Sequence, residues 1–206
     1  MPTKKKIIIF DLDGVLINSI LNMEVSWDLT CKKFGLDIKF INYKKNIGLP
    51  FKIILKKLNI KKNVNLIKNY YDKCSTKNIN LIKLYPNVKK TIEHFKNKNF
   101  LTAVITSKDK KRTKKILTKF DLKFDYVYSP SKNLKPKPFP DQIIKILSKE
   151  KIIKRNCYYI GDMDLDAHFA KNAKIRFIFA KYGYEIKKIK RKYEIKKFEE
   201  IKKIIK

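Results

Sequence analysis

Residues 7–16, IIIFDLDGVL, constrain the fold of this 206-residue chain more than any other stretch. The apolar run at its start is too short for a helix and suits a strand buried on both faces, as in a parallel sheet. Asp11, Asp13 and Gly14 follow this run. Residues two apart on a strand point the same way, so both carboxylates can face one pocket beyond the end of the strand, where open parallel sheets bind ligands. A solvated acidic turn explains these residues equally well, so the rest of the chain must decide.

The hydrophobic pattern changes twice after this stretch. Residues 17–83 carry apolar side chains at helical spacing and predict a small helical bundle. Helical patterns then alternate with short apolar runs, which indicates a parallel sheet with right-handed crossovers. The predicted strands are residues 7–10, 101–105, 125–128, 157–160 and 175–179. We therefore expect an α/β fold with a doubly wound, Rossmann-like, five-stranded parallel sheet. Residues 1–16 and 84–206 would form this core, and residues 17–83 a helical cap inserted after the first strand.

The net charge is the most unusual property of the composition. The chain has 51 Lys and Arg against 19 Asp and Glu, which gives a formal charge of +32. Such a charge provides sequence-independent affinity for phosphates and invites a nucleic-acid interpretation. The lysines, however, are spread over nearly every segment, which resembles a coding bias as much as a selected patch. We therefore expect no specific nucleic-acid partner.

The cysteines and the N-terminus bear on the compartment. Cys31, Cys74 and Cys157 lie far apart without metal-type spacing, and we interpret them as reduced thiols. The apolar run before Asp11 is too short for a signal-peptide core or a membrane span. We expect a cytoplasmic protein that does not bind membranes.

Polar side chains follow several of the predicted strands. They are Asp11 and Asp13, then Thr106, then Lys135 or Lys137, then Asp162 with Asp166 beyond it. Each of them taken alone can be explained without catalysis, because acidic residues and threonine commonly cap helices and lysines are abundant here. Their arrival at successive strand ends is much harder to explain by chance.

Four segments that contain these residues resemble the motifs of one family. They read FDLDGVL at 10–16, VITSK at 104–108, KPKPFP at 135–140 and YIGDMDLDAHFAKNA at 159–173. Together they resemble the haloacid dehalogenase superfamily of phosphohydrolases. The similarity covers nearly the whole chain and is closest to the branch of phosphoglycolate phosphatase and β-phosphoglucomutase, which carries a helical cap between the first two motifs.

The resemblance implies a role for each matching residue. Asp11 would be the nucleophile that forms an aspartyl-phosphate, and Asp13 the general acid and base. Mg²⁺ would be held by Asp11, Asp162 and the backbone carbonyl of Asp13, since hard oxygen ligands and a substrate phosphate suit this ion. Thr106, with Ser107, would bind a phosphoryl oxygen.

Three further assignments complete the expected site. The K-P-x-P-x-P spacing favours Lys135 over Lys137 as the lysine that offsets the negative charge of the site. Asp166 would orient the metal ligands rather than bind the ion. Lys52 in the cap would contact a second anionic group of the substrate.

Three functions follow from these expectations. The favoured one is a Mg²⁺-dependent phosphatase that hydrolyses a small phosphorylated metabolite, acting as a monomer whose cap opens and closes. The first alternative is a phosphomutase of the β-phosphoglucomutase type, which would use the same aspartyl-phosphate. The second is a basic nucleic-acid-binding protein or nucleic-acid end phosphatase, in which the positive charge would bind the phosphate backbone.

Overall fold

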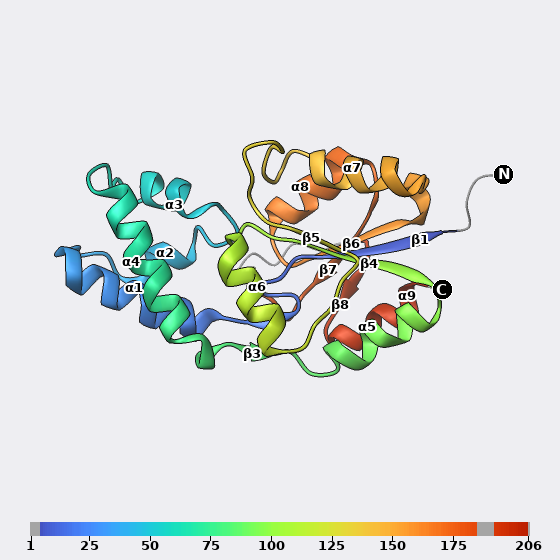
Figure 1. The fold of residues 1–206 in the computed structure, drawn as a ribbon, viewed down its shortest axis with the longest axis horizontal. Helices are drawn as coiled ribbons and strands as arrows, with labels where there is room; N and C mark the ends of the chain where they lie inside the picture. The colour runs from blue at the N-terminus through green and yellow to red at the C-terminus, as the bar shows by residue number, and fades with distance from the viewer. Residues whose placement is uncertain (1–4, 185–191, 206) are drawn as a thin grey trace. The chain divides into compact units, whose positions relative to one another are not determined.

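The computed structural model describes residues 5–184 and 192–205 (Figure 1). The chain divides into two compact units. The core unit is Met1–Ile17 with Leu84–Lys206, and the helical unit is Asn18–Lys83. The sequence placed the start of the insert at residue 17, one residue earlier. The short strands β2 (Ile17–Asn18) and β3 (Lys83–Leu84) contain the two points where the chain passes between the units.

A parallel sheet forms the centre of the core unit, with strand order β5-β4-β1-β6-β7-β8. The strands are β1 (Lys6–Phe10), β4 (Phe100–Ile105), β5 (Tyr126–Tyr128), β6 (Cys157–Gly161), β7 (Arg176–Ala180) and β8 (Glu194–Ile195). The predicted α/β class with a parallel sheet is confirmed. The predicted strand count was one short, because β8 has two residues and leaves too little periodicity to detect.

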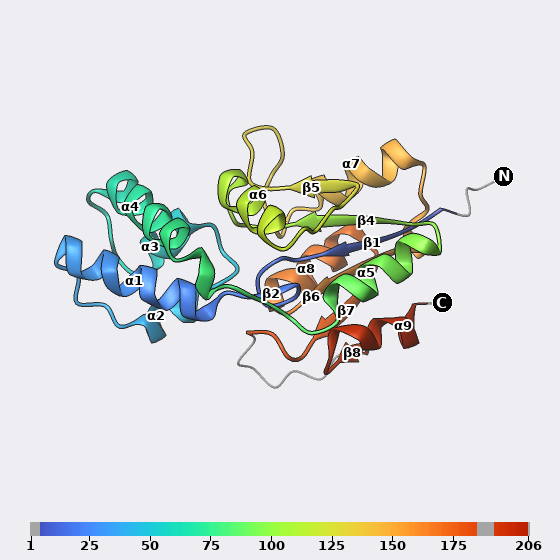
Figure 2. The same cartoon turned by 60° about the horizontal axis from the view of Figure 1, so that its bottom comes forward.

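Helices cover both faces of this sheet (Figures 1 and 2). Residues Ile7 and Ile9 of β1 belong to a buried cluster with side chains of α7 (Asp141–Glu150) and α8 (Asp164–Ala173). Phe10 faces the other layer, where its ring centroid lies 5.6 Å from that of Phe198. The remaining elements of this unit are α5 (Val88–Asn97), α6 (Lys110–Lys119), η2 (Lys154–Asn156), η3 (Phe198–Glu200) and α9 (Ile201–Ile204). Burial on both faces explains why β1 reads as a continuous apolar run.

The helical unit is held together by aromatic packing and by buried hydrogen bonds. Tyr43 packs against Trp27 at 4.8 Å between ring centroids, and Phe51 packs against Tyr71 at 4.4 Å. Its elements are α1 (Ile20–Phe34), α2 (Phe40–Lys44), α3 (Phe51–Lys57), α4 (Val64–Lys77) and η1 (Ile79–Leu81). The α1 and α4 helices are joined by Ser75 Oγ, which donates to Asn22 Oδ1 at 2.7 Å. Within the described residues, no helix is long and apolar enough to cross a membrane.

Candidate active site

Three neighbouring strands bring the expected side chains to one rim of the sheet. Asp11, Thr106 and Asp162 each directly follow a strand, namely β1, β4 and β6. The β1 strand pairs in parallel with both of the others, so the carboxyl ends of all three lie together. The Asp11 backbone N–H donates to the Ile160 carbonyl at 2.9 Å, which extends the pairing to the first carboxylate. The parallel register therefore explains why residues 56 to 151 positions apart in the sequence share one site.

Lys137 is the lysine that contacts Asp11 and Asp166. Its Nζ donates to Asp11 Oδ1 at 2.9 Å and to Asp166 Oδ1 at 2.8 Å, and it is buried. The structure does not bring Lys135, which the sequence analysis favoured, to these carboxylates. The backbone N–H of Lys135 donates to Asp141 Oδ2 at 3.1 Å, and its exposed side chain lies over the Phe139 ring. The contact with the start of α7 turns Lys135 away from the carboxylates, and Lys137 takes its place.

Asp166 is fully engaged by neighbouring groups. Its Oδ1 accepts from Lys137 and from the Tyr159 hydroxyl at 3.0 Å. Its Oδ2 accepts from the backbone N–H groups of Asp162 at 3.2 Å and Met163 at 3.1 Å. A Cβ on Gly161 would lie 2.3 Å from the Asp166 Cβ, so the close approach requires glycine. This carboxylate therefore fixes both the lysine and the loop that carries Asp162.

Asp162 is completely buried and only half satisfied. Its Oδ2 accepts from the Tyr184 backbone N–H at 2.7 Å. Its Oδ1 has no hydrogen-bond partner among the described residues. Gly14 and Gly183 line it so closely that a Cβ on either would clash, the one on Gly14 at 2.0 Å from Asp162 Oδ2. Burying a carboxylate oxygen without a hydrogen-bond partner costs free energy. A bound cation would offset that cost, so the arrangement suits a cation site.

The acidic residues here fit a hard divalent cation. One oxygen from each of Asp11, Asp162 and Asp166 can lie within 4.8 Å of the others, and all three residues are buried. Oxygen ligands of this kind are those that Mg²⁺ takes in proteins. Because Asp166 already accepts four hydrogen bonds, Asp11 and Asp162 are the better ligands of the three.

The pKa values express the crowding of carboxylates. Burial, helped by the nearby Asp166 and Asp13, raises the pKa of Asp11 to about 7, against the lowering effect of Lys137. Burial also raises the pKa of Asp162 well above its ordinary value, helped by Asp166 and Asp11. For Lys137, burial opposes the charged form, but Asp11 and Asp166 outweigh it and the pKa rises. The cluster holds more negative charge than one lysine offsets, which again favours a cation.

Asp13 and Thr106 both contact Lys108, a lysine that the sequence analysis did not select. Lys108 Nζ lies 3.2 Å from Asp13 Oδ2, and the Lys108 backbone N–H donates to Thr106 Oγ1 at 3.1 Å. Burial lowers the pKa of Lys108, while Asp13 works in the opposite direction. Its position next to Thr106 and Ser107 in the VITSK segment was the available signal. Tyr159 and Tyr184, which also contact the carboxylates, gave no such signal.

Ser107 and Lys52 are the remaining residues that the sequence analysis expects to contact the substrate. Ser107 lies beside Thr106 and is half-buried. Lys52 is exposed on α3 of the helical unit, and its contact with substrate stays a prediction.

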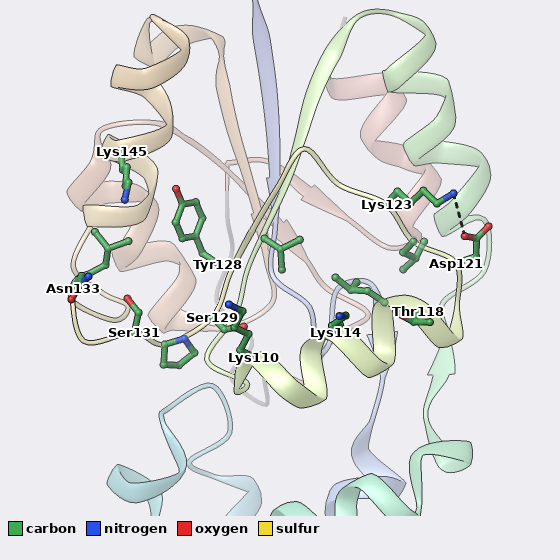
Figure 3. Close-up of a pocket in the computed structure, with 15 residues that line it drawn as sticks. Lys110, Lys114, Thr118, Asp121, Lys123, Tyr128, Ser129, Ser131, Asn133 and Lys145 are labelled. Carbon is green, nitrogen blue, oxygen red and sulfur yellow. Dashed lines mark ion pairs between the residues drawn. The ribbon is translucent and has the colours of Figure 1, made fainter.

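A cavity of about 640 Å³ opens elsewhere in the core unit, along the edge strand β5 (Figure 3). We call it the edge pocket. It is lined by apolar side chains, four lysines and several hydroxyl groups. The lining residues come from α6, the segment between α6 and β5, β5 itself, the loop after β5 and α7. Its one acidic lining residue, Asp121, lies 3.8 Å from Lys123, and both are exposed. The edge pocket therefore offers space without the buried carboxylates of the strand ends.

Comparison with known proteins shows the family of this chain. The family model for haloacid dehalogenase-like hydrolases matches residues 8–180. A phosphoglycolate phosphatase of Aquifex aeolicus is 30% identical over 183 residues, which cover 87% of this chain and 86% of the relative. A protein of Caldanaerobacter subterraneus, provisionally named a pyrophosphatase (PpaX), is 29% identical over 97% of this chain and 94% of its own length.

The fold has close counterparts among solved structures. A haloacid dehalogenase-like hydrolase from Streptococcus pneumoniae superposes with a TM-score of 0.85 at 20% identity, covering 98% of this chain and 99% of the other. The family resemblance drawn from the four sequence motifs is confirmed. The chain belongs to the haloacid dehalogenase-like hydrolase family.

Proposed function

We propose that this protein is a Mg²⁺-dependent phosphatase that hydrolyses a small phosphorylated metabolite through an aspartyl-phosphate on Asp11. The observation that carries the proposal is the contact of Asp11 with the Lys137 ammonium, 2.9 Å away, beside the unpaired Oδ1 of Asp162. A phosphate monoester carries about −1.5 to −2 charges at neutral pH, and it repels an attacking carboxylate. The positive charge at this rim would reduce that repulsion.

The first half of the reaction would form the aspartyl-phosphate. An oxygen of Asp11 attacks phosphorus, and the bond from phosphorus to the ester oxygen breaks. Within the described part of the chain, hydrogen bonds to the Asp11 carboxylate involve only Oδ1, so Oδ2 is the oxygen we assign to the attack. Asp13 gives a proton to the departing oxygen, and Thr106 and Lys137 stabilise the phosphoryl oxygens.

The second half would return the enzyme to its starting state. Asp13, now ionised, takes a proton from a water molecule, whose oxygen attacks phosphorus. The bond between phosphorus and Asp11 breaks and inorganic phosphate leaves. Asp166, held by Tyr159 and two backbone N–H groups, would keep Lys137 directed at Asp11 through both halves.

The Mg²⁺ ion would be held by Asp11 and Asp162, with the Asp13 carbonyl as a further ligand implied by the family. It would supply charge neutralisation and orientation of the phosphoryl group. The names of the curated relatives favour a small phosphorylated substrate, phosphoglycolate in the case of the Aquifex aeolicus protein. We extend this substrate class to the chain, with Lys52 as the candidate contact for a second anionic group.

Phosphate release tests the proposal. The parent protein should release inorganic phosphate from phosphoglycolate or p-nitrophenyl phosphate in the presence of Mg²⁺, and a chelator should abolish the release. Asp11→Asn should lower the rate by at least about 10⁴-fold. Acid quenching during turnover should reveal one added phosphoryl group on the peptide that contains Asp11. Turnover that survives Asp11→Asn would contradict the mechanism.

The same assay separates the alternatives. A mutase would convert a sugar phosphate into an isomer with little release of inorganic phosphate. A nucleic-acid end phosphatase would act on oligonucleotide termini with a steep dependence on salt. We favour hydrolysis of a small substrate because the site residues present here need only water to complete the cycle.

A further inference from the structure

We propose that Lys108 is a positioning residue for proton transfer, which holds the Asp13 carboxyl group in the orientation needed to protonate the departing oxygen. The inference rests on the proposed function, since it assigns Asp13 the role of general acid. It adds a second lysine to the site, with a task different from that of Lys137.

Burial distinguishes Lys108 from the many other lysines of this basic chain. Over residues 5–184 and 192–205, the lysines that are buried are Lys108 and Lys137. Lysine is rarely buried unless its ammonium group is paired, because removing the charge from water is costly. Lys137 pairs with Asp11 and Asp166, whereas Lys108 pairs with Asp13 at 3.2 Å. A coding bias alone would not explain the burial of these two lysines.

The backbone of Lys108 is held at the start of α6. The Asp109 carboxylate caps this helix by accepting from the Arg112 backbone N–H at 3.0 Å. Thr113 Oγ1 donates to the Lys108 carbonyl at 3.3 Å, and the Lys108 N–H donates to Thr106 Oγ1 at 3.1 Å. The ammonium group therefore extends from an anchored backbone position rather than from a free loop.

Asp13 itself lies in a tight turn that leaves its carboxyl group to be oriented by neighbours. The turn is closed by the Gly14 backbone N–H, which donates to the Ile17 carbonyl at 2.9 Å. Backbone contacts of this kind fix the Cα position, but the terminal torsion of an aspartate side chain is intrinsically broad. An ammonium group at 3.2 Å from Oδ2 restricts that torsion. Because small errors in placement reduce proton-transfer rates strongly, this restriction has catalytic value.

One residue thus links two groups that act on opposite sides of the breaking bond. The Lys108 N–H occupies a lone pair of Thr106 Oγ1, which leaves the hydroxyl hydrogen to donate to a phosphoryl oxygen. The Lys108 side chain meanwhile orients Asp13 toward the departing oxygen. Removing the ammonium group should disturb the second task and leave the first, which depends on the backbone, intact.

Leaving-group dependence provides the test. An alkyl phosphate needs a proton on its departing oxygen, whereas p-nitrophenyl phosphate departs readily without one. Lys108→Met should lower kcat/KM for an alkyl phosphate such as phosphoglycolate by about 10- to 100-fold, and for p-nitrophenyl phosphate by less than about 3-fold. Asp13→Asn should show the same selectivity, and adding Lys108→Met to it should cause little further loss on the alkyl phosphate. Lys108→Arg, which keeps the charge, should recover part of the alkyl activity.

Lys110→Met is the matched control, since Lys110 is exposed and two residues further along the chain. It should leave both kcat/KM values within about 2-fold of the parent. Equal losses by Lys108→Met on the two substrates, or full additivity with Asp13→Asn, would overturn the proposal. If Lys108→Met does not fold by circular dichroism, Lys108→Gln is judged by the same criterion. A parent protein that hydrolyses neither substrate would refute the proposed function instead.

Discussion

The strand-end site and the edge pocket differ in what fills them. At the strand ends, Asp11, Asp162 and Lys137 pack against one another with almost no exposed surface. The edge pocket encloses about 640 Å³, but its lysines are exposed and its acidic residue is paired at the surface (Figure 3). Charges interact far more strongly where water is excluded. The edge pocket and the incompletely hydrogen-bonded buried charge therefore lie at different places in this protein, and the proposed reaction belongs to the buried charge.

The two lysines of the KPKPFP segment give the largest expected contrast. Lys137→Met should lower kcat by about 10²–10³-fold, because it removes the buried charge next to Asp11. Lys135→Met should change kcat by less than about 2-fold, since the Lys135 side chain is exposed. Phosphate release under saturating substrate measures both. If Lys135→Met lowered kcat more than Lys137→Met, Lys135 would be the catalytic lysine. The buried charge of Lys137 at the strand ends would then not explain activity.

This contrast also shows where sequence analysis of the site stopped. The apolar run of β1, the alternation of strands and helices, and Asp11, Thr106 and Asp162 at strand ends were readable, because each depends on local pattern and sheet direction. The choice between Lys135 and Lys137 was not, since it depends on the hydrogen bond from the Lys135 backbone to Asp141. The pairing of Lys108 with Asp13 was equally hidden, because tertiary contacts decide which of many lysines is buried.

Gly14 tests how closely the site is packed. It has a φ of +82°, and a Cβ there would lie 2.0 Å from Asp162 Oδ2. Gly14→Ala should therefore lower the free energy of unfolding by about 2–3 kcal/mol, through backbone strain and displacement of the carboxylate. Denaturant unfolding measures the loss. Gly35→Ala is the control, since Gly35 also has a positive φ of +62° but nothing lies within 4 Å of its added Cβ. Equal losses in both variants would mean that backbone strain alone accounts for the effect.

Asp11 should destabilise the metal-free protein as the pH rises. Its pKa is raised from 3.8 to about 7 by burial, so the folded state favours the protonated form. The stability associated with that proton is present below about pH 4 and is lost as the pH rises through about 7. In a chelator, Asp11→Asn should thus melt about 2–8 °C above the parent at about pH 8, with a smaller difference at about pH 5. A parent that is more stable than Asp11→Asn at about pH 8 would mean that the ion pair with Lys137 outweighs the burial of charge.

A substitution in the edge pocket should have the smallest effect on activity and stability. Val127 lines it and has 45% of its surface exposed, so Val127→Arg adds bulk and charge to the pocket without disturbing the core. We expect kcat/KM to stay within about 2-fold of the parent and the free energy of unfolding to change by less than about 0.5 kcal/mol. The substitution is a strict test, because Val127 is next to Tyr128, whose backbone carbonyl accepts a hydrogen bond from the Thr106 N–H at 3.0 Å. A loss above about 10-fold with an unchanged melting temperature would connect the pocket to the reaction through this hydrogen bond. The contrast between open volume and buried charge would then no longer hold.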